Sequence, residues 1–129
     1  MEKSFVTGPW QQKRAFSPAV ITKGEQTTVW LAGHTGAATD DGRPLAGDFD
    51  AQFSQTFRNI ERTLSQCGCK LADIVTMTVF LIDARYTTRM TELRGQLFGD
   101  NFPASAAITV SGFARPDIML EIQCVAVRH

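Results

Sequence analysis

The chain has 129 residues, of which 43% are hydrophobic and 20% charged, a composition typical of one globular domain. Its 13 basic and 13 acidic side chains cancel, so the composition gives no electrostatic support for a nucleic-acid partner. No apolar run approaches the roughly 20 residues that a membrane span needs, and residues 1–12 lack the apolar segment of a secretory signal. We therefore expect one domain, residues 1–129, in the cytoplasm, with neither a nucleic acid nor a membrane as its partner.

The cysteines give little support for a metal site. There are three of them: Cys67 and Cys69 form a Cys-Gly-Cys sequence, and Cys124 lies in an apolar segment. A zinc site usually needs four ligands at suitable spacing, and only two histidines accompany these thiols. We expect structural thiols, no metal and no cofactor.

The first third of the chain predicts an arm and two strands. Residues 1–14 form the N-terminal arm, with a turn at Gly8-Pro9. A first strand is expected over Phe16–Ile21, at an edge or bulge because of its proline. Thr27–Ala32 is β-branched and aromatic and predicts a second strand, whereas the glycine-rich residues 33–47 predict a loop.

Asp48 starts the clearest predicted helix. Apolar side chains recur at steps of four and three, which places them on one face of a helix. These side chains are Phe49, Phe53, Phe57, Ile60 and Leu64. Asp48 can cap the first turn, and Gly68 can end the helix in a left-handed conformation. We expect this stripe to be core; a surface on which bases stack is the remote alternative.

The remaining elements complete an α+β domain of order ββαβαββ. Strands are expected over residues 73–83, 106–111 and 119–127, and a shorter helix over residues 87–98. Helices that separate strands favour parallel pairs with crossover connections. The expected architecture is one mixed sheet with both helices on one face.

The strand over residues 73–83 also predicts an oligomer. Alternation places Val75 and Met77 on one face and Ile74 and Phe80 on the other, so both faces carry apolar groups. Two helices cover only one face of such a sheet, and large exposed apolar patches are rare on monomers. We expect the open face to meet another copy of the chain.

Glu121 is the most informative single residue. It stands in Leu120-Glu121-Ile122, within an apolar strand, where an unpaired carboxylate is costly. Partial burial would raise its pKa and make it a candidate general acid or base. The alternatives are an exposed strand position or a structural ion pair.

Small polar positions open the strand near Pro103. Ser105, Ala107 and Thr109 share one face and are candidates to line a cleft. A hydrolytic triad is disfavoured because no nucleophile-elbow pattern surrounds Ser105. His34 follows a strand end, where ligands often bind, although a loop histidine bonded to the backbone is an equal alternative.

Three arginines are candidates for binding a carboxylate through two parallel hydrogen bonds. Arg94 lies one turn from Thr91, so both side chains point the same way from one helix. Arg14 and Arg115 lie in loops. Taken one at a time, each is expected to be a solvated surface charge.

Several segments in matching order resemble the Rid (YjgF-like) family of reactive-intermediate imine/enamine deaminases. These segments are Phe16-Ser17-Pro18-Ala19-Val20, Ala32-Gly33-His34, Asn59-Ile60, Leu71-Ala72-Asp73-Ile74-Val75, Thr78-Val79-Phe80, Asn101-Phe102-Pro103-Ala104 and Leu120-Glu121-Ile122. The resemblance runs from about Arg14 to Arg128. It implies a chorismate-mutase-like fold of the bacillus type, a homotrimer, and three small-molecule clefts between neighbouring subunits.

The pocket departs from the pattern of the best-known members of this family, which hydrolyse imines to a 2-oxo acid and ammonia. In those members an arginine binds the substrate carboxylate, and a cysteine, a tyrosine and an asparagine complete the pocket. The corresponding positions here are Ser105, Ala107, Phe16 and Thr91. Gly33 and the water-positioning Glu121 match. A charge-assisted hydrogen bond is worth roughly 1.5–3 kcal/mol, which Ser105 cannot supply.

The resemblance therefore implies a hydrolase in which Glu121 activates water against a C=N carbon, with the Gly33 or Ser105 backbone orienting the ligand. The expected substrate is an imine, enamine or related reactive molecule other than a simple 2-imino acid, unless Arg14, Arg94 or Arg115 supplies the missing charge. The alternative is a trimer that binds or senses a small molecule and has lost the deaminase chemistry.

Overall fold

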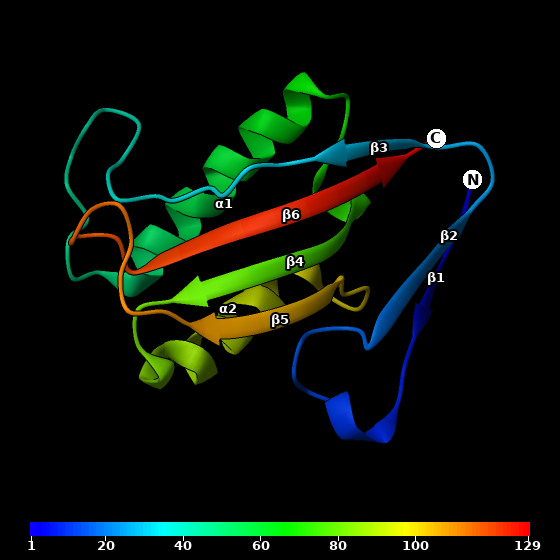
Figure 1. Ribbon diagram of the computed structural model, residues 1–129, viewed down its shortest axis with the longest axis horizontal. Helices are drawn as coiled ribbons and strands as arrows, with labels where there is room; N and C mark the ends of the chain where they lie inside the picture. Colours follow the sequence, from blue (N-terminus) through cyan, green and yellow to red (C-terminus); the bar gives the residue numbers. More distant parts are fainter.

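The computed structural model describes residues 1–129 and has two helices and six strands (Figure 1). The elements are β1 (Glu2–Val6), β2 (Ala19–Lys23), β3 (Thr27–Trp30), α1 (Phe49–Gln66), β4 (Ile74–Leu81), α2 (Thr87–Phe98), β5 (Ala104–Thr109) and β6 (Leu120–Arg128). The predicted α+β class is confirmed. Neither helix is both long and apolar enough to cross a membrane.

The main sheet has four strands in the order β3-β6-β4-β5. The pair β4 and β5 is parallel and joined through α2, whereas β6 runs antiparallel to both β3 and β4. Figure 1 shows the sheet in front of both helices, so one face is covered and the other is open. This agrees with the predicted mixed sheet with two helices on one side.

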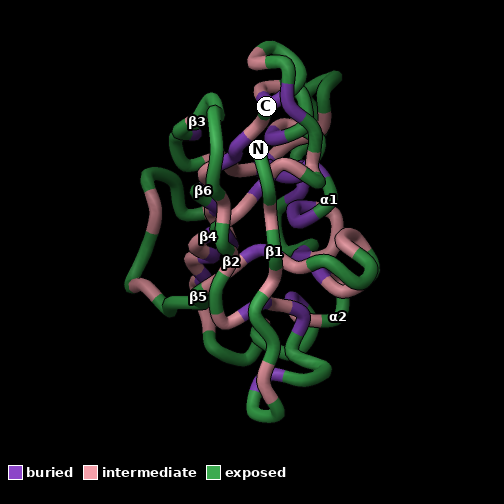
Figure 2. The backbone as a smooth tube through the Cα atoms, turned by 90° about the vertical axis from the view of Figure 1, so that its right-hand side faces the viewer, coloured by how far each residue is buried: buried purple, intermediate pink, exposed green.

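The N-terminal segment contains a strand where an arm was expected. β1 pairs antiparallel with β2, from Glu2 opposite Lys23 to Val6 opposite Ala19, and the two form a separate sheet. No residue of this two-stranded ribbon is fully buried, as Figure 2 shows with the ribbon facing the viewer. The first strand predicted over 16–21 begins three residues and ends two residues too early, since Ser17 instead bridges to Ala104 beside the main sheet.

The predicted apolar stripe of α1 forms the core. None of its five side chains is more than 5% exposed, and they pack with Met77, Val79 and Ile122 from the covered face of the sheet. Asp48 caps the helix by accepting a hydrogen bond from Ala51 N at 3.0 Å. Gly68 follows the helix with φ of +70°, a left-handed conformation that glycine adopts without strain.

A bulge in β4 corrects the predicted faces of this strand. The pairing with β6 shifts between Ile74 and Thr76, so Ile74 points into the core with Met77 and is 2% exposed. Val75, expected beside Met77, is only partly buried. A bulge adds one residue to a strand and reverses the alternation beyond it.

The open face of the sheet is consequently mixed in polarity. It carries Thr78 and Phe80 from β4, which pair with Gln123 and Glu121 of β6. Large apolar side chains also lie exposed there, with Trp30 77% and Ile108 45% exposed. The face is less apolar than the alternation predicted, but it still presents uncovered aromatic and aliphatic surface.

The loop over residues 33–47 is fixed against α1 by hydrogen bonds. Gln52 is fully buried; its Nε2 donates to Leu45 O at 3.0 Å and to Asp117 O at 2.8 Å, and its Oε1 accepts from Met119 N. Asn59 Nδ2 donates to Thr35 O at 2.8 Å. Helix α1 therefore positions both the 33–47 loop and the segment that leads into β6.

Candidate functional site

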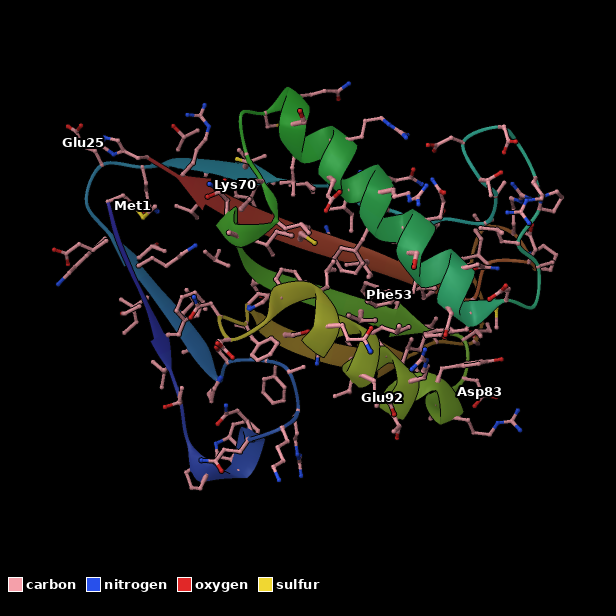
Figure 3. The ribbon with its side chains drawn as sticks, turned by 180° about the vertical axis from the view of Figure 1, so that it is seen from behind. Met1, Glu25, Phe53, Lys70, Asp83 and Glu92 are labelled. Atoms are coloured by element: carbon pink, nitrogen blue, oxygen red, sulfur yellow. The ribbon has the colours of Figure 1, made fainter.

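A cleft of about 540 Å³ lies between the segment before β2, the helix α2 and the edge strand β5. Most of the substrate-binding residues predicted from the sequence line it: Arg14, Phe16, Thr91, Arg94, Ser105 and Ala107. Thr91 and Arg94 come from one side of α2, as the helical spacing predicted. Figure 3 views the chain from this side, with Glu92 marking α2. The cleft is thus a single hollow that unites residues distant in sequence.

Arg94 is the dominant charge in this cleft. The residue is 3% exposed, although it lines the hollow. Its Nη1 donates to Ser105 Oγ at 2.7 Å and its Nη2 to Arg14 O at 3.1 Å, while its buried Nε has no partner. Burial lowers the pKa of Arg94 to about 10, so it is still cationic at neutral pH.

The backbone before β2 adopts an unusual conformation to reach Arg94. Lys13 and Ala15 have φ of 67° and 61°, in the left-handed region that non-glycine residues seldom occupy. Ala15 is buried, and a Cβ on Gly95 of α2 would lie 3.8 Å from the Ala15 Cβ. This double turn delivers the Arg14 carbonyl to the guanidinium. No glycine or asparagine marks it, so sequence patterns gave no sign of it.

Glu121 lies outside this cleft, on the open face of the sheet. It lines a second hollow of about 360 Å³ together with Phe80, Gly112 and Phe113. Its side chain is partly buried, and its carboxylate makes no hydrogen bond or ion pair within the chain. Glu121 therefore does not form the structural ion pair that was one of the predicted alternatives.

The Glu121 carboxylate packs directly against the backbone of Gly33. Trp30 pairs with Val125 and His34 bridges to Ile122, so the three residues 31–33 oppose the two residues 123–124. This is a β-bulge with Gly33 in it. A Cβ on Gly33 would lie 2.9 Å from Glu121 Cδ and overlap the carboxylate itself. Only a glycine lets the carboxylate lie directly over this backbone.

His34 and Arg115 have structural partners. The Nδ1 of His34 donates to Ala32 O at 2.7 Å, and its Nε2 lies 2.8 Å from Thr63 Oγ1. It lines neither hollow, which fits the alternative of a loop histidine bonded to the backbone. Arg115 forms an exposed ion pair with Asp117 and also lies away from the cleft.

The two hollows face opposite sides of the main sheet. Ser105 pairs with Met77 of β4, and Glu121 pairs with Phe80. Positions three apart on a regular strand point to opposite faces, and Met77 is on the covered face. Ser105 and Ala107 therefore lie on the helix side of the sheet, and Glu121 lies on the open side.

The sequence profile of the family described as Endoribonuclease L-PSP matches residues 10–128 of the chain. The chain belongs to this family, the Rid (YjgF-like) family. Two relatives carry the name 2-iminobutanoate/2-iminopropanoate deaminase. The one from Homo sapiens is 28% identical over 88% of this chain and 80% of its own length, and the one from Salmonella typhimurium 29% identical over 95% and 89%. The resemblance inferred from the sequence is confirmed.

A solved structure of the Rid family supports the same fold. The Yersinia pestis protein YyfB, of the conserved Rid family, superposes with a TM-score of 0.83 at 22% identity, covering 98% of both chains. At this identity the likeness concerns the fold alone. The site of this Rid-family chain must therefore be judged from its own residues.

Sequence reasoning identified most of the cleft but missed parts of the site. It did not predict Lys13 or the N-terminal turn of α2 as part of the cleft wall, nor Phe80 and Phe113 beside Glu121. Phe113 follows Gly112 in a turn after β5, and nothing in the turn pattern distinguishes it from a surface residue. The signal for these residues lies in the fold and not in any local motif.

Proposed function

We propose that this Rid-family chain is a cytoplasmic homotrimeric hydrolase that deaminates imines or enamines, with its sites between neighbouring subunits. One observation carries the proposal: the Arg94–Ser105 cleft and the Glu121 hollow lie on opposite faces of one sheet. A single chain cannot apply both to one small molecule, whereas two copies can. The uncovered apolar side chains of the open face support such an association.

In the proposed reaction Glu121 acts as general base. Its carboxylate makes no ion pair and accepts no hydrogen bond within the chain, so it is available to take a proton from water. The resulting hydroxide adds to the imine carbon, the C–N bond of the adduct breaks after the nitrogen is protonated, and a carbonyl compound and ammonia leave. Imine and water are the only reactants, and the relatives named as imine deaminases support this chemistry.

The walls of the cleft favour a larger substrate than a simple 2-imino acid. Phe16, Met90 and Ala107 make its apolar surface, and Ser105 and Ala107 are short side chains. Phe16 lacks the hydroxyl group that a tyrosine would bring. We propose an imine with a bulky apolar side chain as the substrate class.

The variant Glu121→Gln tests the proposed base. It keeps the size of the side chain but removes the proton acceptor, so we expect kcat to fall about 100-fold or more, the usual range for a general base. The assay measures ammonia release from imines generated in situ by an amino-acid oxidase. Unchanged turnover in this variant would eliminate the role of Glu121.

A binding or sensing trimer is the second candidate. It is favoured by the replacement of four family pocket positions by Phe16, Thr91, Ser105 and Ala107. Here the ammonia assay would stay at the buffer rate with every amino acid, while small ligands would still raise the Tm by binding the folded state. Ammonia release above the buffer rate supports the enzyme.

A further inference from the structure

We infer that Arg94 is the anion-binding residue of the cleft and holds the carboxylate of the substrate from helix α2. This inference names the substrate class of the proposed function and in that respect rests on it. Ser105 on strand β5 has no charge, and Arg94 on helix α2 supplies one instead. The Arg94 guanidinium lies next to Ser105, with Nη1 2.7 Å from Ser105 Oγ.

Arg94 has no counter-charge within the chain. Arg94 is 3% exposed and forms no ion pair within the chain. Glu92 is the one carboxylate that lines the cleft, and it is engaged by Arg89 at 2.8 Å. A buried cation without a counter-charge is unfavourable. The face of Phe16, 6.0 Å from the guanidinium, offsets only part of this cost.

Arg94 and Ser105 also have hydrogen-bond donors that no group of the chain uses. A guanidinium has five N–H groups, and Arg94 uses Nη1 and Nη2 once each, while its Nε has no partner. Ser105 Oγ already accepts a hydrogen bond from Arg94, so the proton of its own hydroxyl is free to donate elsewhere. Arg94 and Ser105 thus present unused donors that a negatively charged acceptor such as a carboxylate would satisfy.

The contact between Arg94 and the Arg14 carbonyl also requires an unfavourable backbone conformation. The left-handed residues Lys13 and Ala15 hold the Arg14 carbonyl on Nη2. Strained backbone of this kind collects at ligand-binding sites. An arginine needed only for packing would be served equally by methionine, without the buried charge. The observations together favour a carboxylate ligand over a structural role.

The test measures binding without turnover, by calorimetry, of 4-methyl-2-oxopentanoate and of its uncharged methyl ester. The intact protein should bind the acid about 10-fold or more tightly than the ester, and Arg94→Met should remove that preference by weakening acid binding about 10- to 100-fold. The double variant Arg94→Met/Ser105→Arg should restore the preference by returning the charge to the strand. Arg85→Met, in the exposed turn before α2 and paired with Asp83 away from the cleft, should bind as the intact protein does.

The inference would be overturned if the intact protein showed no preference for the acid, or if Arg94→Met bound the acid as tightly as the original protein. It would also be overturned if Arg94→Met and Glu121→Gln both lowered the Tm without changing the selectivity for the acid. The last would mean that a neighbour's glutamate neutralises Arg94 structurally. If Arg94→Met does not fold, Arg94→Lys decides, since it should weaken the acid but leave ester binding unchanged, and equal acid affinity would refute the clamp. Absent ammonia release with intact acid selectivity would refute the deaminase alone.

Discussion

At the scale of single residues, Gly33 and Gly36 of the 33–47 loop are under different constraints. A Cβ on Gly33 would meet only the far end of the Glu121 side chain. A Cβ on Gly36 would lie 2.5 Å from Thr56 N and 2.8 Å from Gln52 O, which belong to the backbone of α1. A flexible side chain can move aside, whereas a helix backbone cannot. Gly33 therefore constrains the site, and Gly36 constrains the fold.

We predict opposite outcomes for alanine at these two positions. The free energy of unfolding of Gly33→Ala should stay within about 1 kcal/mol of that of the original protein. Its deaminase rate should fall about 10-fold or more, because the added methyl group displaces Glu121. Gly36→Ala should lose about 1–3 kcal/mol of stability, the usual cost of overpacking. Urea unfolding and ammonia release are measured on both. Full activity in Gly33→Ala would show that the placement of Glu121 over Gly33 is irrelevant.

Residues whose role depends on neighbours in sequence were predictable, and those that depend on distant backbone were not. Asp48 caps α1 and Gly68 ends it because both roles follow from helix chemistry. The common direction of Thr91 and Arg94 follows from helical spacing. The burial of Arg94 does not, because it depends on the turn at Lys13 and Ala15, which no local pattern marks.

At the scale of elements, helix α1 positions the 33–47 loop and the segment that leads into β6. Its buried Gln52 serves three backbone groups, Leu45 O, Asp117 O and Met119 N. These groups belong to the loop that carries Gly33 and to the segment that leads into β6. One amide of α1 thus anchors both segments.

We predict that Gln52→Leu lowers the free energy of unfolding by about 3 kcal/mol, because it leaves buried backbone groups without partners at about 1–3 kcal/mol each. Gln66→Leu, at the exposed end of the same helix, makes the same chemical change without burial and should stay within about 0.5 kcal/mol. Both values come from urea denaturation. A similar cost at the two positions would contradict the anchoring role of Gln52.

The turn before α2 predicts a pH dependence. Asp83 Oδ1 accepts from Arg85 N at 2.8 Å, and its Oδ2 pairs with Arg85 Nη2 at 2.7 Å. The Arg85 side chain lowers the pKa of Asp83 from 3.8 to about 2. A carboxylate with a lowered pKa in the folded state stabilises that state above its unfolded pKa. This contribution is therefore present above about pH 4 and is lost as the pH falls toward 2.

The substitution Asp83→Asn isolates this effect, because asparagine keeps the acceptor for Arg85 N and removes only the charge. We expect the Tm of the original protein to exceed that of the variant by a small, constant amount at pH 5–7. The difference should shrink between pH 4 and pH 2, where Asp83 becomes protonated. A difference that stays constant to pH 2 would show that the charge of Asp83 does not stabilise the fold.

Elements with strong periodicity were predicted well, and those with weak or interrupted patterns were not. The stripe of α1 and the helix α2 appear where their spacing predicts them. β1 was missed because Glu2–Val6 is short and mostly polar, so it has little β signal of its own. The β4 bulge at Ile74 reversed the predicted faces because one added residue changes the parity of the alternation.

At the scale of the whole molecule, the cleft of Arg94 and the hollow of Glu121 lie on opposite faces of one sheet, and the proposed trimer rests on this division. The family resemblance predicted a trimer, and the open face offers Trp30 and Ile108 as uncovered apolar surface. Arg94 and Glu121 lie on different sides of the sheet, so in the proposed trimer each chain would contribute one half to each of two sites. Closed cyclic symmetry would repeat this arrangement three times.

We therefore predict that two inactive variants complement each other. Glu121→Gln lacks the base but has the cleft, and Arg94→Met lacks the anion clamp but has the base. After each is shown to be impaired alone, the two are mixed in equal amounts, dissociated and reassembled. Random assembly places an intact Arg94 opposite an intact Glu121 in about a quarter of the seams, so about a quarter of the original deaminase rate should return.

The same mixture provides its own controls. Light scattering on each preparation should give three times the 14.2 kDa mass of the chain, and reassembly of either variant with itself should restore nothing. Activity that stays at the level of the separate variants in a fully mixed trimer would mean that both residues act from one chain. Because the two hollows open on opposite faces of a four-stranded sheet, that result would also require the sheet to rearrange. Recovered activity therefore tests the trimer, the seam and the two residue roles in one measurement.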